Sequence, residues 1–257
     1  MIPVALTIAG SDPSGGAGIQ ADIKTFHQLR VYGAAVITLI TVQNTGRVSR
    51  VETLAPDLVM EQITAVVEDL PPRAAKTGAL GNAAVVAAIA GMQMPCPLIV
   101  DPVMISKHGA PLVDAEAREA LRNCLLPKAA LVTPNLHEAA ALAGIEVGSV
   151  DQMREAAVRI ARLGPSVLVK GGHLSGDAVD ILYHEGKFTE FRSPRIDTRH
   201  THGTGCTYSA AITAFVAQGL ALVDAVTRAK RFIDEAIRTS PGLGAGSGPV
   251  NHWADSL

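Results

Sequence analysis

The sequence predicts an α/β fold in which a mostly parallel, doubly wound β-sheet carries helices on both faces. Short runs rich in Val, Ile, Leu and Ala alternate with longer segments whose apolar residues recur at helical spacing. This alternation is typical of parallel sheets that are covered on both sides. Polar residues and glycines also gather where the strand runs end. We find no internal repeat or long linker, so residues 1–257 are expected to form one domain.

The first half of the chain contributes two strongly apolar strands, at 3–9 and 34–42. Between them lies a helical pattern with Ile19, Phe26 and Leu29 on one face. The remaining elements expected here are a half-exposed strand at 48–54, a helix opened by Pro56, a short strand at 74–78, a helix at 82–91 and a strand at 98–101.

The second half of the chain continues the alternation. We expect helices at 114–126, 136–143, 150–163, 204–219 and 221–238, strands at 130–133 and 166–170, and a hairpin across 178–193. The dipeptide Glu185-Gly186 is the expected turn of that hairpin.

Composition limits the possible partners. The 257 residues have a formal net charge of -2 and a pI of about 6.4, so no basic footprint for nucleic acid or an acidic membrane is expected. Three widely separated cysteines argue against a disulfide framework and favour a reducing, cytoplasmic setting. No apolar run reaches the roughly 20 residues of a membrane helix, and the N-terminus lacks the basic region of a signal peptide.

The ends of the strands define the expected site, because ligands of such sheets bind beyond the carboxyl ends of the strands. Unusual polar or glycine residues follow almost every predicted strand: Asp12, 43–44, 77–78, 101–102, 133–135 and 170–173. Their shared position on one rim is the strongest structural argument for a site.

The segment 199–209, RHTHGTGCTYS, is the most informative stretch. Gly203, Thr204 and Gly205 precede Cys206 and a helical run, so backbone N–H groups can face an anion such as phosphate. The field of a helix N-terminus favours thiolate over thiol, which makes Cys206 a candidate base. The alternative is a glycine-rich turn in which Cys206 is a small core residue.

Two other classes of site are weaker. Gly16-x-Gly18-x-x-Ala21 matches the dinucleotide fingerprint formally, but the second strand ends at Gln43-Asn44 without the required acidic residue, so a Rossmann dehydrogenase is rejected. His200, His202 and Cys206 can suggest a zinc site or a Cys–His hydrolase. A zinc site lacks its remaining ligands at regular spacing, whereas a hydrolase stays open.

Asp12 and Gln43 are candidate ligands for a substrate. The Asp12 carboxylate can accept from a ligand hydroxyl, and its alternative role is to cap the next helix. The Gln43 amide can pair with the ring nitrogen and amino group of an aminopyrimidine, or simply bond to backbone.

The remaining candidates concern phosphate and metal. Asn135 and Glu138 share a face of the first turn of a helix, where Glu138 can hold Mg²⁺ through water or close a capping box. Asp101 can order a phosphate-bound metal. Lys107 and Lys170 can neutralise phosphates, although an isolated lysine is usually only solvated.

With AGSDPSGGAGIQAD, DPVM-x-x-K-x-G, TPN-x-x-E, KGGH and THGTGC in this order, the chain resembles the hydroxymethylpyrimidine/phosphomethylpyrimidine kinases of thiamine biosynthesis, within the ribokinase superfamily. The resemblance runs from about Thr7 to the terminal GPVNHW. The wider superfamily usually has Asp as the base, and the pyrimidine-kinase branch shares Cys at this place, as in Cys206. Gln43 is also typical of the branch, whereas many relatives have Met where this chain has Ala79.

The resemblance implies a ribokinase-like fold and an enzyme that uses MgATP to phosphorylate 4-amino-5-hydroxymethyl-2-methylpyrimidine and then its monophosphate. It implies a catalytic set of Cys206, Gly203, Thr204, Gly205 and Lys170. The other implied residues are Asp12, Gln43 and Gly10 at the substrate, Asn135, Lys170, Thr204 and Lys107 at ATP, and Glu138 and Asp101 at Mg²⁺.

The hairpin would help to cover the nucleotide, and a homodimer is expected by analogy. The alternatives are a pyridoxal kinase of the same superfamily and a non-catalytic pyrimidine-binding module.

Overall fold

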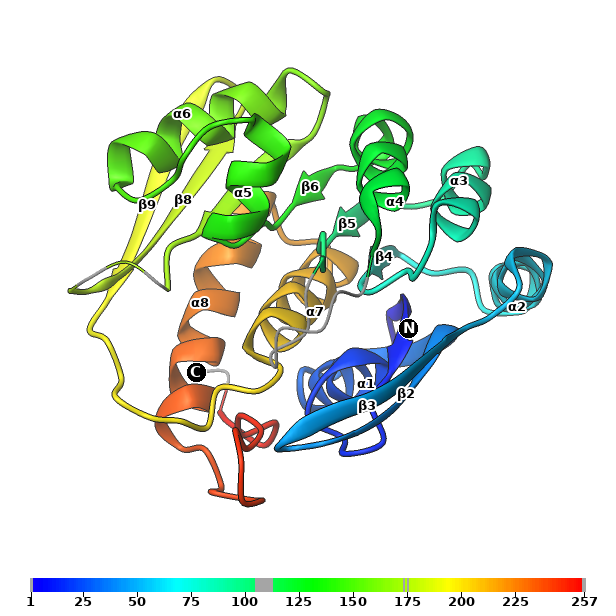
Figure 1. Cartoon of the computed structure of the whole chain (residues 1–257), viewed down its shortest axis with the longest axis horizontal. Coiled ribbons are helices and arrows are strands. Elements are labelled where there is room, and N and C mark those ends of the chain that lie inside the picture. The colour runs from blue at the N-terminus through cyan, green and yellow to red at the C-terminus, as the bar shows by residue number, and fades with distance from the viewer. Residues whose placement is uncertain (1, 105–112, 173, 175, 256–257) are drawn as a thin grey trace.

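The computed structural model describes residues 2–104, 113–172, 174 and 176–255 (Figure 1). Its centre is a nine-stranded sheet with the order β3-β2-β1-β4-β5-β6-β7-β8-β9. The six strands from β2 to β7 in this order are parallel, and β3, β8 and β9 join the edges in antiparallel pairs. The α/β fold with a mostly parallel sheet is therefore confirmed.

The strands have the following bounds: β1 Val4–Ser11, β2 Tyr32–Asn44, β3 Arg47–Thr53, β4 Ala74–Thr77, β5 Leu98–Val100, β6 Leu131–Val132, β7 Ser166–Lys170, β8 Ala178–His184 and β9 Lys187–Ser193. The helices are α1 Gly18–Gln28, α2 Pro56–Asp69, α3 Ala83–Gly91, α4 Ala115–Ala120, α5 Leu136–Ala143, α6 Val150–Ala161, α7 Thr204–Ala217 and α8 Leu222–Arg238.

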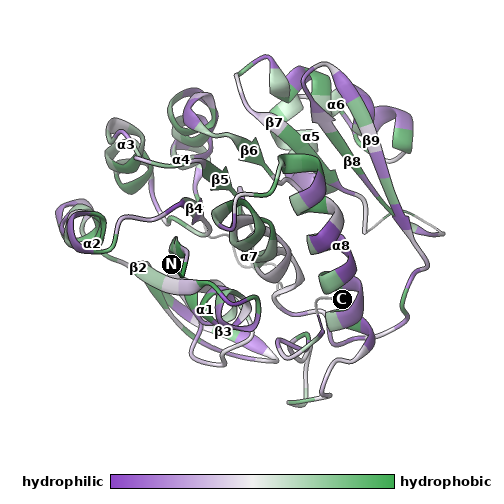
Figure 2. Ribbon diagram, turned by 180° about the vertical axis from the view of Figure 1, so that it is seen from behind, coloured by the Kyte–Doolittle hydropathy of each residue, from purple (hydrophilic) through white to green (hydrophobic). Residues whose placement is uncertain are grey.

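Helices cover both faces of the sheet, and alternate residues of the strands point to the two faces. Leu6 and Ile8 of β1 join the core beneath α2, α3, α4, α5 and α6. Ala5, which precedes Leu6 in the same strand, joins the second core with α1, α7 and α8. Figure 2 shows α7 as hydrophobic around its circumference, whereas α8 has a hydrophilic outer side. Helix α7 is therefore the central helix of its layer, packed between α1 and α8.

Several element boundaries differ from expectation by one or two residues, and two differences have a clear structural cause. Strand β2 extends to Asn44, because Gln43 and Asn44 pair with Val48 and Arg47 of β3. The expected helix at 114–126 divides after α4 into a π-helical turn, Leu121–Leu125, and a 3₁₀ turn, Leu126–Lys128. Pro127 has no N–H to donate back along an α-helix, which explains the change near the end of the segment.

The hairpin of β8 and β9 turns where expected. Glu185 and Gly186 have φ values of 48° and 75°, the pair of positive φ angles that a tight hairpin turn requires. The two strands continue the sheet beyond β7, where β8 pairs with β7.

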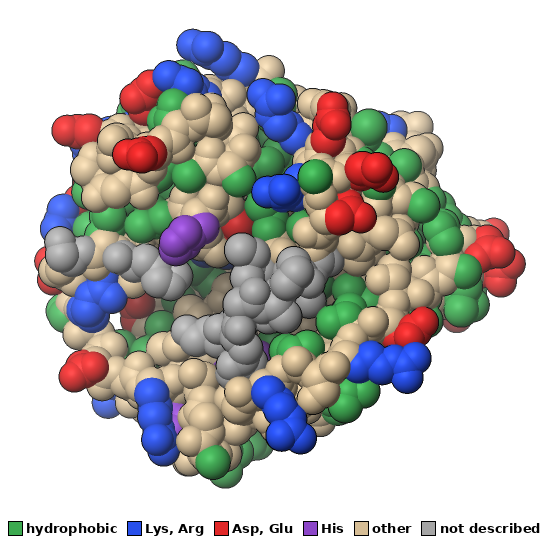
Figure 3. All heavy atoms as spheres, in the orientation of Figure 1, with side chains coloured by type: hydrophobic (Ala, Val, Ile, Leu, Met, Phe, Trp, Pro, Cys, Tyr) green, Lys and Arg blue, Asp and Glu red, His purple; other side chains and the backbone are tan. Residues whose placement is uncertain are grey.

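The surface agrees with the near-neutral composition. On the face in Figure 3, both basic and acidic side chains are exposed, and neither sign covers the whole face. Within the described part of the chain, no helix combines the length and apolarity needed to cross a membrane.

Candidate active site

The predicted rim exists because β1, β2, β4, β5, β6 and β7 are parallel and end at one edge of the sheet. Asp12, Gly78, Asp101 and Thr133 directly follow their strands, and Lys170 ends β7. The N-terminus of α7 approaches the same edge, since Gly205 lies next to the Lys170 side chain. The rim thus brings together residues from the whole length of the chain.

The glycine cradle at the start of α7 fits closely against the loop before α1. Gly203 has a φ of 77°, and a Cβ there would collide with the Gly16 carbonyl group, so this position requires glycine. Thr204 Oγ1 donates to the Thr201 carbonyl oxygen at 2.8 Å. The next two N–H groups, of Gly205 and Cys206, belong to the first helical turn, where no intrahelical acceptor exists.

Gly205 opens the cradle toward a charged pair. A Cβ at Gly205 would lie 3.4 Å from Lys170 Nζ and 3.8 Å from Asp101 Oδ2. An anion held by the first turn of α7 would therefore meet a lysine as well as a helix N-terminus.

Lys170 and Asp101 form an ion pair at 2.9 Å, with side-chain exposures of 13% and 2%. Thr133 Oγ1 donates to Asp101 Oδ1 at 3.1 Å, and Ser209 Oγ donates to Asp101 Oδ2 at 3.2 Å. Burial raises the pKa of Asp101, but Lys170, Lys76 and these hydrogen bonds outweigh it and lower the pKa below its usual value. Asp101 is thus an anion that holds Lys170 in place.

Glu138 and Asn135 form the capping box at the start of α5. The Asn135 N–H donates to Glu138 Oε2 at 2.9 Å, and the Glu138 N–H donates to Asn135 Oδ1 at 3.0 Å. Burial raises the pKa of Glu138 to about 7, with Lys170 opposing and Asp101 adding to the rise. The described residues contain no group of three His, Cys, Asp or Glu side chains arranged for a metal.

Cys206 differs from expectation in its ionisation. Burial raises the pKa of its thiol to about 11, although Lys76 and the Gly18 N–H act in the opposite direction. The expectation that the helix N-terminus leaves Cys206 as thiolate is therefore wrong, because desolvation outweighs the field of the helix.

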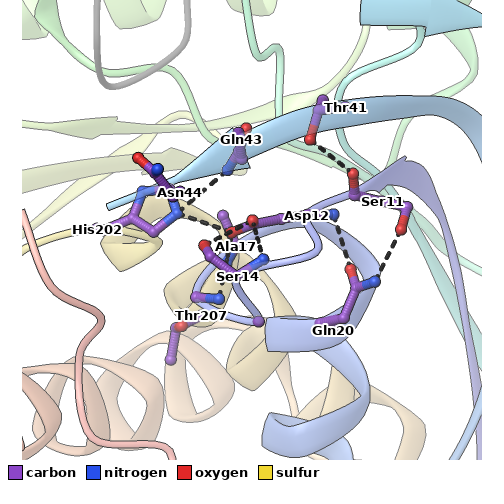
Figure 4. Close-up of polar contacts among 12 residues, drawn as sticks. Ser11, Asp12, Ser14, Ala17, Gln20, Thr41, Gln43, Asn44, His202 and Thr207 are labelled. Carbon is purple, nitrogen blue, oxygen red and sulfur yellow. Dashed lines mark hydrogen bonds and ion pairs between the residues drawn. The ribbon is translucent and has the colours of Figure 1, made fainter. Parts of the chain in front are cut away.

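Asp12 organises the loop that the cradle rests on (Figure 4). Its Oδ1 accepts from the N–H and hydroxyl of Ser14 at 2.8 and 2.7 Å, and its Oδ2 accepts from the N–H groups of Gly16 and Ala17 at 3.2 and 2.9 Å. His202 Nε2 lies 2.8 Å from Oδ2. Burial raises the pKa of Asp12, but His202 and Ser14 reverse this and lower it to about 2.

His202 lies between Asp12 and Gln43, because its Nε2, which faces Asp12 Oδ2, also lies 3.4 Å from the side-chain nitrogen of Gln43 (Figure 4). Sequence reasoning treats His202 only as a metal or hydrolase residue and misses its place beside Asp12, which lies 190 residues away in the chain. Gly10 lies under the same loop, where a Cβ would meet Leu39 at 2.5 Å.

A second charged pair lies deeper and was missed by sequence reasoning. Lys76 Nζ lies 2.9 Å from both carboxylate oxygens of Asp22, and both side chains have an exposure of 0%. Thr7 Oγ1 donates to Asp22 Oδ2 at 2.6 Å. The signal was present in the sequence, since Lys76 is the charged residue of the otherwise uncharged strand AAKT.

The loop after Lys170 is anchored from the hairpin side of the sheet. The Gly171 N–H donates to Asp180 Oδ1 at 3.0 Å, and Arg195 donates to the carbonyl oxygens of Gly172 and Gly176 at 2.8 and 2.9 Å. Lys107, the other expected phosphate ligand, lies outside the described residues.

An anion cradle that faces a cation, at the carboxyl edge of a mostly parallel sheet, suits the transfer of a phosphoryl group to a small molecule. The fold and this edge of the sheet define the class as a small-molecule kinase.

The comparisons with known proteins specify the family. The family model for phosphomethylpyrimidine kinase matches residues 12–251. The chain is 46% identical to hydroxymethylpyrimidine/phosphomethylpyrimidine kinase of Synechococcus elongatus, with 98% of each chain covered. It is 49% identical to the thiamine biosynthesis bifunctional protein ThiED of Geobacter sulfurreducens over 96% of its own length, and it spans about half, 51%, of that relative. The chain belongs to the phosphomethylpyrimidine kinase family.

Solved structures agree with the fold. An ADP complex of pyridoxal kinase from Bacillus subtilis has a TM-score of 0.91 at 39% identity, with 99% of this chain and 98% of that chain covered. Phosphomethylpyrimidine kinase from Clostridium difficile 630 has a TM-score of 0.82 at 45% identity, with 91% and 99% covered.

Proposed function

We propose that the protein uses ATP to phosphorylate the hydroxymethyl group of 4-amino-5-hydroxymethyl-2-methylpyrimidine, and then phosphorylates the monophosphate to the diphosphate. The observation that carries this proposal is the cradle of Gly203–Cys206 opposite Lys170, within a chain that belongs to the phosphomethylpyrimidine kinase family. Phosphoryl transfer depends mainly on alignment and on neutralisation of charge, and this arrangement offers both.

In this proposal Cys206 is the general base of the first transfer. The backbone N–H groups from Gly203 to Cys206, with Thr204 fixed on Thr201, hold the oxygens of the transferred group. Lys170 neutralises phosphate charge. The second transfer starts from a phosphate oxygen that is already largely ionised near neutral pH, so it needs no base.

The pyrimidine would lie over the loop that contains Gly10 and Asp12. Gln43 reads the ring nitrogen and amino group, since its amide offers both a donor and an acceptor. The Asp12 carboxylate already accepts from its own loop and faces His202, so we assign it the task of holding this pocket in shape.

Asn135, Lys170, Thr204 and Lys107 are proposed to contact ATP. Asp101 and Glu138 fit the Mg²⁺ that accompanies ATP, because both carboxylates are buried and Asp101 lies close enough to raise the pKa of Glu138. Mg²⁺ is usually held by one or two carboxylates together with substrate phosphates, and it would supply neutralising charge there.

The test is an ATP-coupled assay that offers the pyrimidine alcohol, its monophosphate and pyridoxal side by side. We expect turnover of both pyrimidines, with a higher kcat/KM than for pyridoxal. The second candidate, a pyridoxal kinase, is favoured by the likeness to the B. subtilis enzyme and predicts the reverse order. Binding of a pyrimidine without ATP consumption would instead support a non-catalytic module.

The organisation of the protein is also a proposal. We infer one domain over residues 1–257, a homodimer and a cytoplasmic location, on the family resemblance and the cysteine content. Light scattering coupled to size-exclusion chromatography tests the homodimer, and a monomer mass would contradict it.

A further inference from the structure

The buried pair of Lys76 and Asp22 lies behind the cradle and has no contact with solvent. Both side chains have an exposure of 0%, and Thr7 adds a hydrogen bond to the carboxylate. Replacing such a pair with well-packed apolar residues is often neutral or stabilising, so the pair is not explained by stability alone. Its position relative to Cys206 offers another explanation.

Helix α1 connects the pair to the sulfur. The Gly18 N–H interacts with the Cys206 sulfur, and Asp22 lies one helical turn after Gly18 on the same face of α1. Helix α7, which carries Cys206, packs against both α1 and β4. The Lys76 ammonium group on β4 also approaches the rim, since a Cβ at Gly78 would lie 3.8 Å from it.

Four charged groups from different parts of the fold lie close enough to Cys206 to interact with its thiolate electrostatically. They are Lys76 on β4, Lys170 on β7, Asp22 on α1 and Asp101 after β5. Burial raises the pKa of the thiol, Lys76 lowers it, and Asp22 and Asp101 raise it. The ammonium group of Lys76 is itself kept charged by Asp22, which raises its pKa against the effect of burial.

We propose that Lys76 is a positioning residue of the first phosphoryl transfer, whose ammonium group, fixed by Asp22 and Thr7, stabilises the thiolate of Cys206. This inference rests on the proposed role of Cys206 as a base. The thiolate takes the proton of the substrate hydroxyl as the hydroxyl oxygen forms its bond to the γ-phosphorus of ATP. The bond from that phosphorus to the bridging oxygen breaks, its electron pair leaves with ADP, and the proton remains on sulfur until it passes to solvent.

The test measures alkylation of Cys206 by iodoacetamide as a function of pH, with the Cys206 peptide quantified by mass spectrometry. The thiolate is the reacting form, so the rate follows the thiolate fraction. In Lys76→Met, we expect Cys206 to react about tenfold more slowly at a given pH, the change that one unit of pKa produces. Cys124, which is exposed, provides an internal reference in each sample.

Two further variants separate this effect from a loss of folding. Asp22→Asn with Lys76→Met removes both charges and keeps an acceptor for Thr7, and we expect Cys206 to react more slowly there too, because the thiolate again lacks the Lys76 ammonium group. Lys230→Met is the matched control, because Lys230 is a mostly buried lysine held by Asp180 at 3.1 Å and Asp234 at 3.3 Å. We expect its Cys206 to react as in the wild type.

Alkylation rates within twofold of wild type in both Lys76 variants, or an equal slowing in Lys230→Met, would overturn the proposal. The alkylation needs no substrate, so it decides the link between Lys76 and Cys206 even where the pyrimidine assay fails. With the proposed function intact, Lys76→Met also lowers kcat for the alcohol more than kcat for the monophosphate, and the pH profile of the alcohol step moves to higher pH.

Discussion

Two lysine–aspartate pairs act on Cys206, and they differ in what can reach them. Lys76 and Asp22 have exposures of 0% each, whereas the Lys170 side chain is 13% exposed and faces Gly205 of the cradle. The N···O distance is 2.9 Å in both pairs. The same ion pair therefore suits two different roles. The open pair, Lys170 with Asp101, is accessible to a phosphate, whereas the closed pair, Lys76 with Asp22, is proposed to act through Cys206.

Experiments on variants of either ion pair need a measurement of stability as a control. Removing one partner of a buried ion pair leaves an uncompensated charge and typically costs about 3–5 kcal/mol of stability. Activity of such variants has to be read beside an unfolding curve, and a change that separates the two transfers is more informative than a loss of both.

The largest effect is expected for Cys206→Ala. Loss of a general base typically costs about 10²–10⁴-fold, so we expect kcat for the pyrimidine alcohol to fall about a thousandfold. The monophosphate step should lose less than about tenfold, because its nucleophile is already ionised. Separate assays of the two transfers measure this, with Cys124→Ala, at an exposed thiol, as the control. Equal losses in both steps would assign Cys206 a positional role.

Lys170→Met is expected to weaken both transfers alike. Its ammonium group would face the phosphates in either reaction, and removal of one such stabilising group costs about 10²-fold or more in kcat. The measurement is kcat and KM for ATP with each pyrimidine, using Lys230→Met as a matched lysine control. A loss confined to the alcohol step would show that the open pair, like the closed one, acts through Cys206.

Asp12→Asn is expected to reduce stability by about 2 kcal/mol at pH 7. The pKa of Asp12 is lowered from 3.8 to about 2 in the folded protein. The folded state therefore favours the charged form, and its contribution is fully present above about pH 4 and is lost as pH falls toward about 2. Urea unfolding at pH 7 and pH 3 measures this, with Asp69→Asn at an exposed position as the control. An unchanged unfolding midpoint at pH 7 would contradict the assignment.

The sequence was sufficient for the sheet, the rim and the cradle, because each depends on a local pattern. Strand ends could be read from apolar runs, and the place of Gly203 followed from the motif before α7. The sequence did not predict how burial and neighbouring charges together set the pKa values of the site residues. The expected thiolate at Cys206 ignored desolvation, since a sequence does not say how deeply a thiol is covered.

The long-range pairs were harder still. Lys76 and Asp22 are 54 residues apart, and Asp12 and His202 are 190 apart. Only the register of β1 with β4 and the packing of α7 on α1 bring them together. A lysine in the strand AAKT was a visible anomaly, but its partner was not identifiable without the fold.

Near pH 5, Glu138→Gln is expected to have the smallest effect on stability, and it tests what else surrounds the Lys170–Asp101 pair. Burial raises the pKa of Glu138 from 4.5 to about 7, so the folded state favours the protonated form. The wild type should therefore lose stability as pH rises from about 4.5 to about 7, and the glutamine variant should remove that loss while keeping the capping box. We expect the variant to gain about 2–3 kcal/mol relative to wild type at pH 8 compared with pH 5, measured by urea unfolding beside Glu119→Gln at an exposed position of α4. An identical pH dependence of unfolding in the wild type and the Glu138→Gln variant would contradict the raised pKa of Glu138.

The same variant also tests the proposed metal role of Glu138. If Glu138 also holds Mg²⁺ through water, the variant will need more Mg²⁺ for half-maximal activity although its fold is intact, which separates the metal role from the cap.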